Sequence, residues 1–183
     1  MKSLLKQFAK TQVSLADKTA TKAAVSKALS DAVKSNLAIF YFSGHGTHTK
    51  ATSDKTEVDG EDEYICCYDT VMADNEIWSI ISQSKGRVVL IFDCCHSGTM
   101  YRAPSAVTMQ KMCAQPRAQH KVDGPISMLC WSGCPDNTYS WGSKSGGYMT
   151  NALRKYFSKS LTYDKLWKKI EADKSVKKYE IVQ

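Results

Sequence analysis

Two short apolar runs along the chain each end abruptly in small and polar residues. The first run, LAIFYF at residues 37–42, is followed by SGHG, and the second, VVLIF at residues 88–92, is followed by DCCHSG. Continuous runs of β-branched and bulky side chains are typical of strands buried within a parallel sheet. Ligands bind at the carboxyl ends of the strands in such sheets. The pattern therefore predicts two buried parallel strands whose polar ends carry the chemistry.

The rest of the chain alternates predicted helices with short strands. Helical spacing of apolar residues predicts helices over 20–34, 75–84 and 147–158, and a last helix capped by Thr162. Shorter apolar segments predict strands over 64–68, 126–131 and 178–182. Helices that alternate with buried strands indicate an α/β fold.

Two stretches lack any apolar period. Polar residues fill 47–63, which we interpret as a long surface loop, and residues 99–124 are predicted to be a flexible connection. Between them, Asp74 is the expected N-cap of the helix over 75–84.

A histidine and a cysteine close the two central strands. His45 follows the first strand and Cys95 follows the second, 50 residues further along the chain. A cysteine at a strand end is most often a small buried hydrophobe, and a single histidine in a loop is most often a surface group. Together, at the same edge of a parallel sheet, a thiol and an imidazole form an activated nucleophile. We therefore interpret the two residues as a catalytic pair.

The neighbours of this pair have predictable roles. Cys95 is the expected nucleophile, and His45 takes the thiol proton as a general base. The backbone N–H groups of Cys95 and Gly46 are candidates for an oxyanion hole. Cys94 competes with Cys95 for the nucleophile's role, and because adjacent strand residues face opposite sides, only one of the two can face the histidine. Asp93, two residues before Cys95, faces the same side, where it either attracts a basic substrate side chain or only orders the loop.

Composition excludes several classes of protein. The chain has 183 residues, 43% of them hydrophobic, which is enough for one domain with a real core. No apolar stretch reaches the roughly 18 residues of a membrane span. The N-terminal MKSLLKQFAKTQ has no apolar core of signal-peptide length, so we expect a cytoplasmic protein with no membrane association. The seven cysteines form no pair of CxxC motifs, which argues against a structural zinc site.

Positive charge gathers near the C-terminus. The net charge is +7, and residues 154–178 hold nine Lys or Arg against three Asp or Glu. The basic residues are not interleaved with aromatic ones as in single-strand-binding proteins, so we expect a solvated helix surface and no nucleic-acid partner.

The two strand-end motifs, YFSGHG at residues 41–46 and DCCHSG at residues 93–98, resemble the His and Cys motifs of metacaspases, the caspase-like cysteine peptidases. A histidine about 50 residues before the cysteine is also typical of caspases. The family has its nucleophile just before His-Ser-Gly, so the resemblance implies that Cys95 is the nucleophile and that Cys94 is structural. Weaker similarities extend the resemblance over roughly residues 20–157; they lie at Asp62-Glu63, Ile65–Asp69, Asp74–Ile77, Ser132–Cys134 and Gly146–Leu153.

The resemblance implies a caspase-like three-layer α/β/α sandwich with a mostly parallel central sheet. Residues 1–183 would form one peptidase domain, with a large-subunit-like part over 1–98, a connecting loop over 99–124 and a small-subunit-like part over 125–183. The implied activity is that of a cysteine endopeptidase that uses a Cys-His dyad to cut proteins and peptides after Arg or Lys.

The resemblance also implies binding residues. Ser43 and Asp93 line the pocket for the basic residue before the cut, and Asp136 adds to its wall. No cofactor is needed for the chemistry, but calcium is an expected activator, with Asp62 and Asp74 at two of the family's ligand positions. Asn75 and Arg102 stand where relatives have acids, which predicts weak binding because calcium prefers several charged oxygens.

The front of the chain departs from the family pattern. Relatives begin with an additional strand and a Cys-x-x-Asp segment that contributes to the pocket, and this chain starts after that point. The sheet is then expected to lack an edge strand, and a partner that supplies the segment is one expectation. Two alternatives stay open, namely an inactive or partner-dependent caspase-like regulatory domain and a peptidase of the legumain, gingipain or CHAT type.

Overall fold

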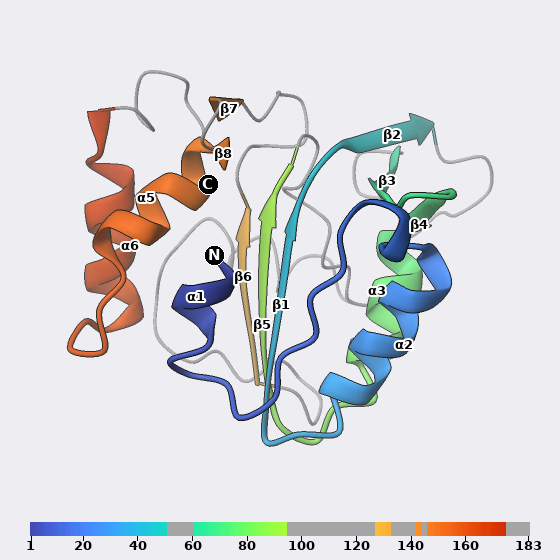
Figure 1. Ribbon diagram of the computed structural model, residues 1–183, viewed down its shortest axis with the longest axis horizontal. Helices are drawn as coiled ribbons and strands as arrows, with labels where there is room; N and C mark the ends of the chain where they lie inside the picture. Colours follow the sequence, from blue (N-terminus) through green and yellow to red (C-terminus); the bar gives the residue numbers. More distant parts are fainter. Residues whose placement is uncertain (51–60, 95–126, 133–141, 144–145, 175–183) are drawn as a thin grey trace.

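The computed structural model describes residues 1–50, 61–94, 127–132, 142–143 and 146–174 (Figure 1). Its helices and strands, in chain order, are α1 (Lys2–Leu5), the 3-10 helix η1 (Asp17–Thr19), α2 (Lys22–Ala32), β1 (Leu37–Ser43), β2 (Gly46–Lys50), β3 (Glu61–Cys66), β4 (Val71–Ala73), α3 (Asp74–Ile81), β5 (Arg87–Asp93), β6 (Ser127–Ser132), β7 (Gly142–Ser143), β8 (Gly146–Gly147), α5 (Tyr148–Tyr156) and α6 (Tyr163–Glu171).

The central sheet is parallel, with the strand order β1-β5-β6. Its strands correspond to the predicted runs at 37–42, 88–92 and 126–131, which are confirmed. β5 lies in the middle, where six of its seven residues are buried. A strand covered on both faces needs apolar side chains on both, which is why its sequence shows a continuous run and no alternation.

Helices cover both faces of this sheet (Figure 1). On one face, α2 and α3 pack against alternate strand residues that include Val88, Leu90 and Phe92. On the other, α5 and α6 pack against the intervening residues Val89 and Ile91. This arrangement confirms the predicted α/β fold with three layers and a parallel central sheet.

A second, antiparallel sheet has the order β2-β3-β4. Its first strand, β2, directly continues the turn after β1, beyond the carboxyl end of that strand (Figure 1). The prediction of a surface loop over 47–63 is wrong at both ends of that range, because β2 and the first half of β3 lie there. Glu63 in β3 is 0% exposed. A polar strand at the periphery shows no apolar run, so only the tertiary packing reveals it.

The predicted helix ends agree only in part with the structure. Thr162 caps α6 as predicted, because its side chain accepts a hydrogen bond from the Lys165 backbone N–H at 3.4 Å. Asp74, however, is the first residue of α3 and not its N-cap. The cap is Ala73, whose N–H donates to Glu76 Oε2 at 2.9 Å. A glutamate in the first turn can accept a hydrogen bond from the backbone N–H of the cap residue. An aspartate at the cap position would instead accept one from a backbone N–H within the first turn.

The turn that leads into β5 depends on Gly86. A Cβ atom at this position would lie 2.5 Å from Ser35 O and 2.6 Å from Asn36 O, in the turn that leads into β1. The next residue, Arg87, donates its N–H to Asn36 O at 2.9 Å. Because Gly86 has no side chain, the two backbone segments can approach this closely, and β1 and β5 begin side by side. The two strands are paired along their length, so they also end side by side.

The described helices include none that is both long and apolar enough to cross a membrane. The connection predicted over 99–124 and the strand predicted over 178–182 lie outside the described residues.

Candidate active site

The carboxyl ends of β1 and β5 meet at one edge of the central sheet. Ser43 pairs with Asp93 in the register of the two strands, and the Gly44 N–H donates to Asp93 O at 3.4 Å. His45 follows two residues after Ser43. The fold therefore brings the histidine motif to the end of the strand that leads into the cysteine motif. Cys95 itself, with its backbone N–H, lies outside the described residues.

The main chain at His45 is fixed from the side by β3. Its carbonyl accepts a hydrogen bond from the Cys66 N–H at 2.9 Å, and the next residue, Gly46, pairs with Ile65 at the start of β2. The His45 side chain is exposed to solvent. An imidazole on an anchored backbone with an accessible ring can meet a substrate without the loop having to order first.

The Asp93 carboxylate lies inside the molecule, where Asp93 is only 4% exposed. Its Oδ2 accepts a hydrogen bond from the Thr150 backbone N–H at 3.0 Å and a second, short one from the Thr150 hydroxyl. Thr150 is the third residue of α5, whose N-cap is Gly147. A carboxylate at a helix N-terminus satisfies an orphan backbone donor and interacts favourably with the helix dipole.

Gly147 leaves the room that this carboxylate occupies. A Cβ atom on Gly147 would collide with both carboxylate oxygens of Asp93. The backbone of α5 therefore approaches the end of β5 more closely than a residue with a side chain would allow.

A third side chain extends this contact to β1. The hydroxyls of Tyr41 and Thr150 lie 2.6 Å apart. Burial, with the nearby Asp93 charge, raises the pKa of the Tyr41 phenol, so it keeps its proton. Sequence reasoning missed Tyr41 and Thr150, because nothing local distinguishes them from other aromatic and helical residues. The only signal in the sequence is that Thr150 lies three residues after a Gly-Gly pair, at the start of a predicted helix.

Four cysteines lie in the described part of the chain, and all four are at least partly buried. Cys94 is 1% exposed and packs in the core against α2 and α3, on the opposite side of β5 from Ile91. Burial raises the pKa of the thiols of Cys66 and Cys67. The interpretation of Cys94 as structural agrees with this position.

The two carboxylates of the expected calcium site occupy different elements. Asp62 lies in β3, opposite Thr49 of β2. Asp74 is 0% exposed at the start of α3, and its Oδ1 accepts the Asn75 N–H at 2.7 Å. Within the described part of the chain, no three His, Cys, Asp or Glu side chains are grouped as ligands of one ion. Arg102 and the predicted pocket residue Asp136 lie outside that part.

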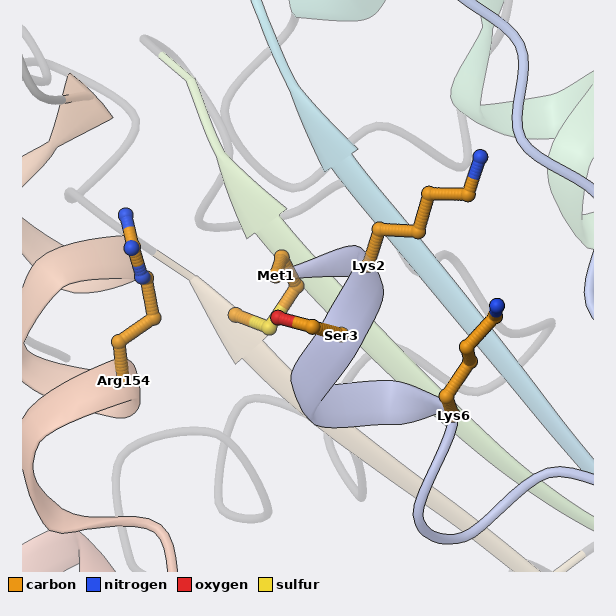
Figure 2. Close-up of a pocket in the computed structure, with 5 residues that line it drawn as sticks. All are labelled: Met1, Lys2, Ser3, Lys6 and Arg154. Carbon is orange, nitrogen blue, oxygen red and sulfur yellow. The ribbon is translucent and has the colours of Figure 1, made fainter.

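A surface hollow of about 370 Å³ lies elsewhere, between α1 and α5 (Figure 2). It is lined by Met1, Lys2, Ser3, Lys6 and Arg154, none of which is a predicted site residue. Figure 2 shows Lys2 and Lys6 pointing away from Arg154. None of the lining residues belongs to the carboxyl ends of β1 and β5, so the hollow is separate from the strand-end site.

The chain is similar to known proteins over most of its length. The family model described as caspase domain matches residues 1–179. Inactive metacaspase-4 of Trypanosoma brucei brucei is 33% identical in an alignment of 147 positions that covers 67% of this chain and 41% of that protein. Metacaspase-1 of Botryotinia fuckeliana is 31% identical in an alignment of 153 positions that covers 79% of this chain and 34% of that protein. The chain thus spans less than half the length of these curated relatives.

A solved structure shares the fold. The crystal structure of a protein from Geobacter sulfurreducens superposes with a TM-score of 0.65 and 26% sequence identity. The match covers 86% of this chain and 71% of that one.

Proposed function

This chain belongs to the caspase domain family and is metacaspase-like, and from that premise we propose that it is a cysteine endopeptidase that cuts peptide bonds after Arg or Lys. The observation that carries the proposal is the parallel register of β1 and β5, which end side by side at Ser43 and Asp93. The proposed catalytic residues His45 and Cys95 each lie two residues after one of these paired ends. Neighbouring parallel strands that end in complementary catalytic groups are typical of α/β enzymes.

In the proposed reaction, His45 takes the proton of the Cys95 thiol, and the thiolate attacks the carbonyl carbon of the scissile bond. The N–H groups of Cys95 and Gly46 donate to the oxyanion that forms. His45 then gives its proton to the leaving amine, and water hydrolyses the thioester in a second round of the same steps. The exposed ring and anchored main chain of His45 suit a group that must reach both sulfur and substrate.

The proposed preference for basic substrates depends on charge at the same edge. Asp93 supplies a buried carboxylate at the end of β5, and Ser43 lies beside it in register. A carboxylate shielded from water attracts a guanidinium or ammonium group more strongly than an exposed one. Asp136 is proposed as a further part of this wall.

Cleavage of peptides that differ only before the scissile bond tests the function. We expect cutting after Arg and Lys, and little or none after Asp or Gln, measured as kcat/KM with and without calcium. Efficient cutting after Asp would contradict the proposed specificity.

A partner-dependent regulatory domain without peptidase activity is the alternative. It is favoured by the 33% identity to a relative that is itself named inactive. A wild-type protein that cuts none of the peptides, but whose Cys95 still reacts with a thiol reagent, would support this alternative.

Calcium is expected to activate weakly. The proposed ligands are the two acids Asp62 and Asp74, whereas Asn75 and Arg102 stand at positions where relatives carry further acids. Ligand charge determines calcium affinity, so activation should need about millimolar calcium. Calorimetry measures the affinity directly, and a sub-micromolar dissociation constant would contradict this expectation.

A further inference from the structure

Three hydrogen-bonded side chains link β1, α5 and the end of β5. Tyr41 comes from β1, Thr150 from the first turn of α5 and Asp93 from β5. Thr150 and Asp93 are 6% and 4% exposed. Residues 41 and 150 are far apart in sequence, so the contact exists only because α5 packs over this face of the sheet. Figure 1 shows the N-terminal end of α5 near the upper end of that sheet.

The direction of the hydrogen bonds among these three side chains follows from counting protons. An ionised carboxylate only accepts hydrogen bonds, and a threonine hydroxyl has a single proton to donate. The Thr150 hydroxyl donates that proton to Asp93 Oδ2, so its contact with Tyr41 is one in which it accepts. The phenol of Tyr41 is therefore the donor, and the order runs from Tyr41 through Thr150 to Asp93.

This series of hydrogen bonds orients the Asp93 carboxylate as well as stabilising it. Two donors from one residue, the N–H and the hydroxyl of Thr150, converge on Oδ2 and restrict rotation of the carboxylate. The missing side chain of Gly147 allows the helix to come this close. Hydrogen bonds in a buried, low-dielectric setting strengthen one another, so the Tyr41 donor makes the Thr150 hydroxyl a better donor.

We propose that Thr150, aligned by Tyr41, is a positioning residue for specificity that holds the Asp93 carboxylate in the orientation in which it meets the basic side chain of the substrate. This inference rests on the proposed function, in which Asp93 recognises Arg or Lys. It deepens that function by assigning specificity to a helix residue that follows the connection over 99–124, and to a tyrosine two residues before Ser43.

The test compares Thr150→Val, Thr150→Ser and Tyr41→Phe for peptides with Arg or Gln before the cut. Valine keeps the volume and the backbone N–H but removes the hydroxyl, so kcat/KM for Arg should fall about tenfold, mainly through KM, while the value for Gln changes less than about twofold. Serine restores the hydroxyl and should return the preference for Arg to within about twofold of wild type. Tyr41→Phe should lower the preference for Arg by about threefold, because the Thr150 hydroxyl loses its alignment.

Thr162→Val is the matched control, because Thr162 caps the next helix through its hydroxyl, outside the proposed site. It should lower thermal stability and leave the ratio of Arg to Gln cleavage unchanged. Calorimetric binding of Nα-acetyl-arginine amide to the Cys95→Ala protein, with and without Thr150→Val, repeats the comparison without catalysis. There, loss of the hydroxyl should weaken binding about tenfold.

The outcomes separate this inference from the proposed function. A Thr150→Val protein that loses activity equally toward Arg and Gln, or that keeps its full preference for Arg, overturns the positioning role alone. A wild type with no preference for Arg overturns the proposed specificity and this inference with it. Should Thr150→Val not fold, an unchanged preference in Tyr41→Phe overturns the inference, and a reduced one supports it.

Discussion

Replacing Cys95 or His45 with alanine is expected to abolish peptide cleavage, whereas Cys94→Ala keeps most of it. Without the thiol no acyl intermediate forms, and without the imidazole the thiol is weakly ionised and the leaving amine lacks a proton donor. Loss of either member of such a pair should lower kcat by at least about 10³-fold. The measurement is kcat and KM for an Arg peptide with each purified variant.

Cys94→Ala is the internal control for this result. Cys94 is 1% exposed in the core that α2 and α3 form against the sheet, so its removal should cost stability and little activity. The loss of a buried side-chain atom of this size should be about 1 kcal/mol in the free energy of unfolding. An inactive Cys94→Ala protein beside an active Cys95→Ala protein would show that the nucleophile is wrongly assigned.

Asp93→Asn should lower kcat/KM for Arg and Lys peptides by well over tenfold, or about 1.4 kcal/mol of transition-state stabilisation or more. Asparagine keeps the shape of the side chain and one oxygen that accepts the Thr150 N–H and hydroxyl, but it removes the charge. The ratio of Arg to Gln cleavage therefore isolates the electrostatic part of recognition. A ratio unchanged from wild type would contradict a substrate-binding role for Asp93.

The Asp93→Ala variant tests the structural role of Asp93, which is separate from its proposed role in substrate binding. Alanine also removes the acceptor at the N-terminus of α5, which leaves buried donors unsatisfied, so the free energy of unfolding should fall by about 2 kcal/mol. Asp173→Asn is the matched control, because Asp173 is likewise buried, at 7% exposure, but pairs with Lys155 and Tyr156 at the C-terminal end of α5, away from the helix start that holds Asp93. That variant should change stability without changing the ratio of Arg to Gln cleavage.

The corrections to the predicted elements have a common physical origin. The strands of the central sheet were predictable because burial on both faces demands a continuous apolar run. The strand β2 and the first half of β3 were not, because their polar residues follow no local period and Glu63 is buried only by what packs around it. The second half of β3 falls within the strand predicted over 64–68. Likewise, Asp74 is a frequent N-cap residue type, yet Glu76 takes over the cap of α3 at Ala73.

By itself, the sequence determined the α/β layering, the strands that end at Ser43 and Asp93, and the pair of motifs that follow them, because each of these leaves a local pattern in residue type. Only the tertiary structure decided which groups surround those ends. The Cys66 N–H anchors the His45 carbonyl, and Thr150 holds Asp93 from 57 residues further along the chain. The spacing of residues along the sequence has no relation to such contacts, because they arise when α5 and β3 pack against a sheet that has already brought its strand ends together.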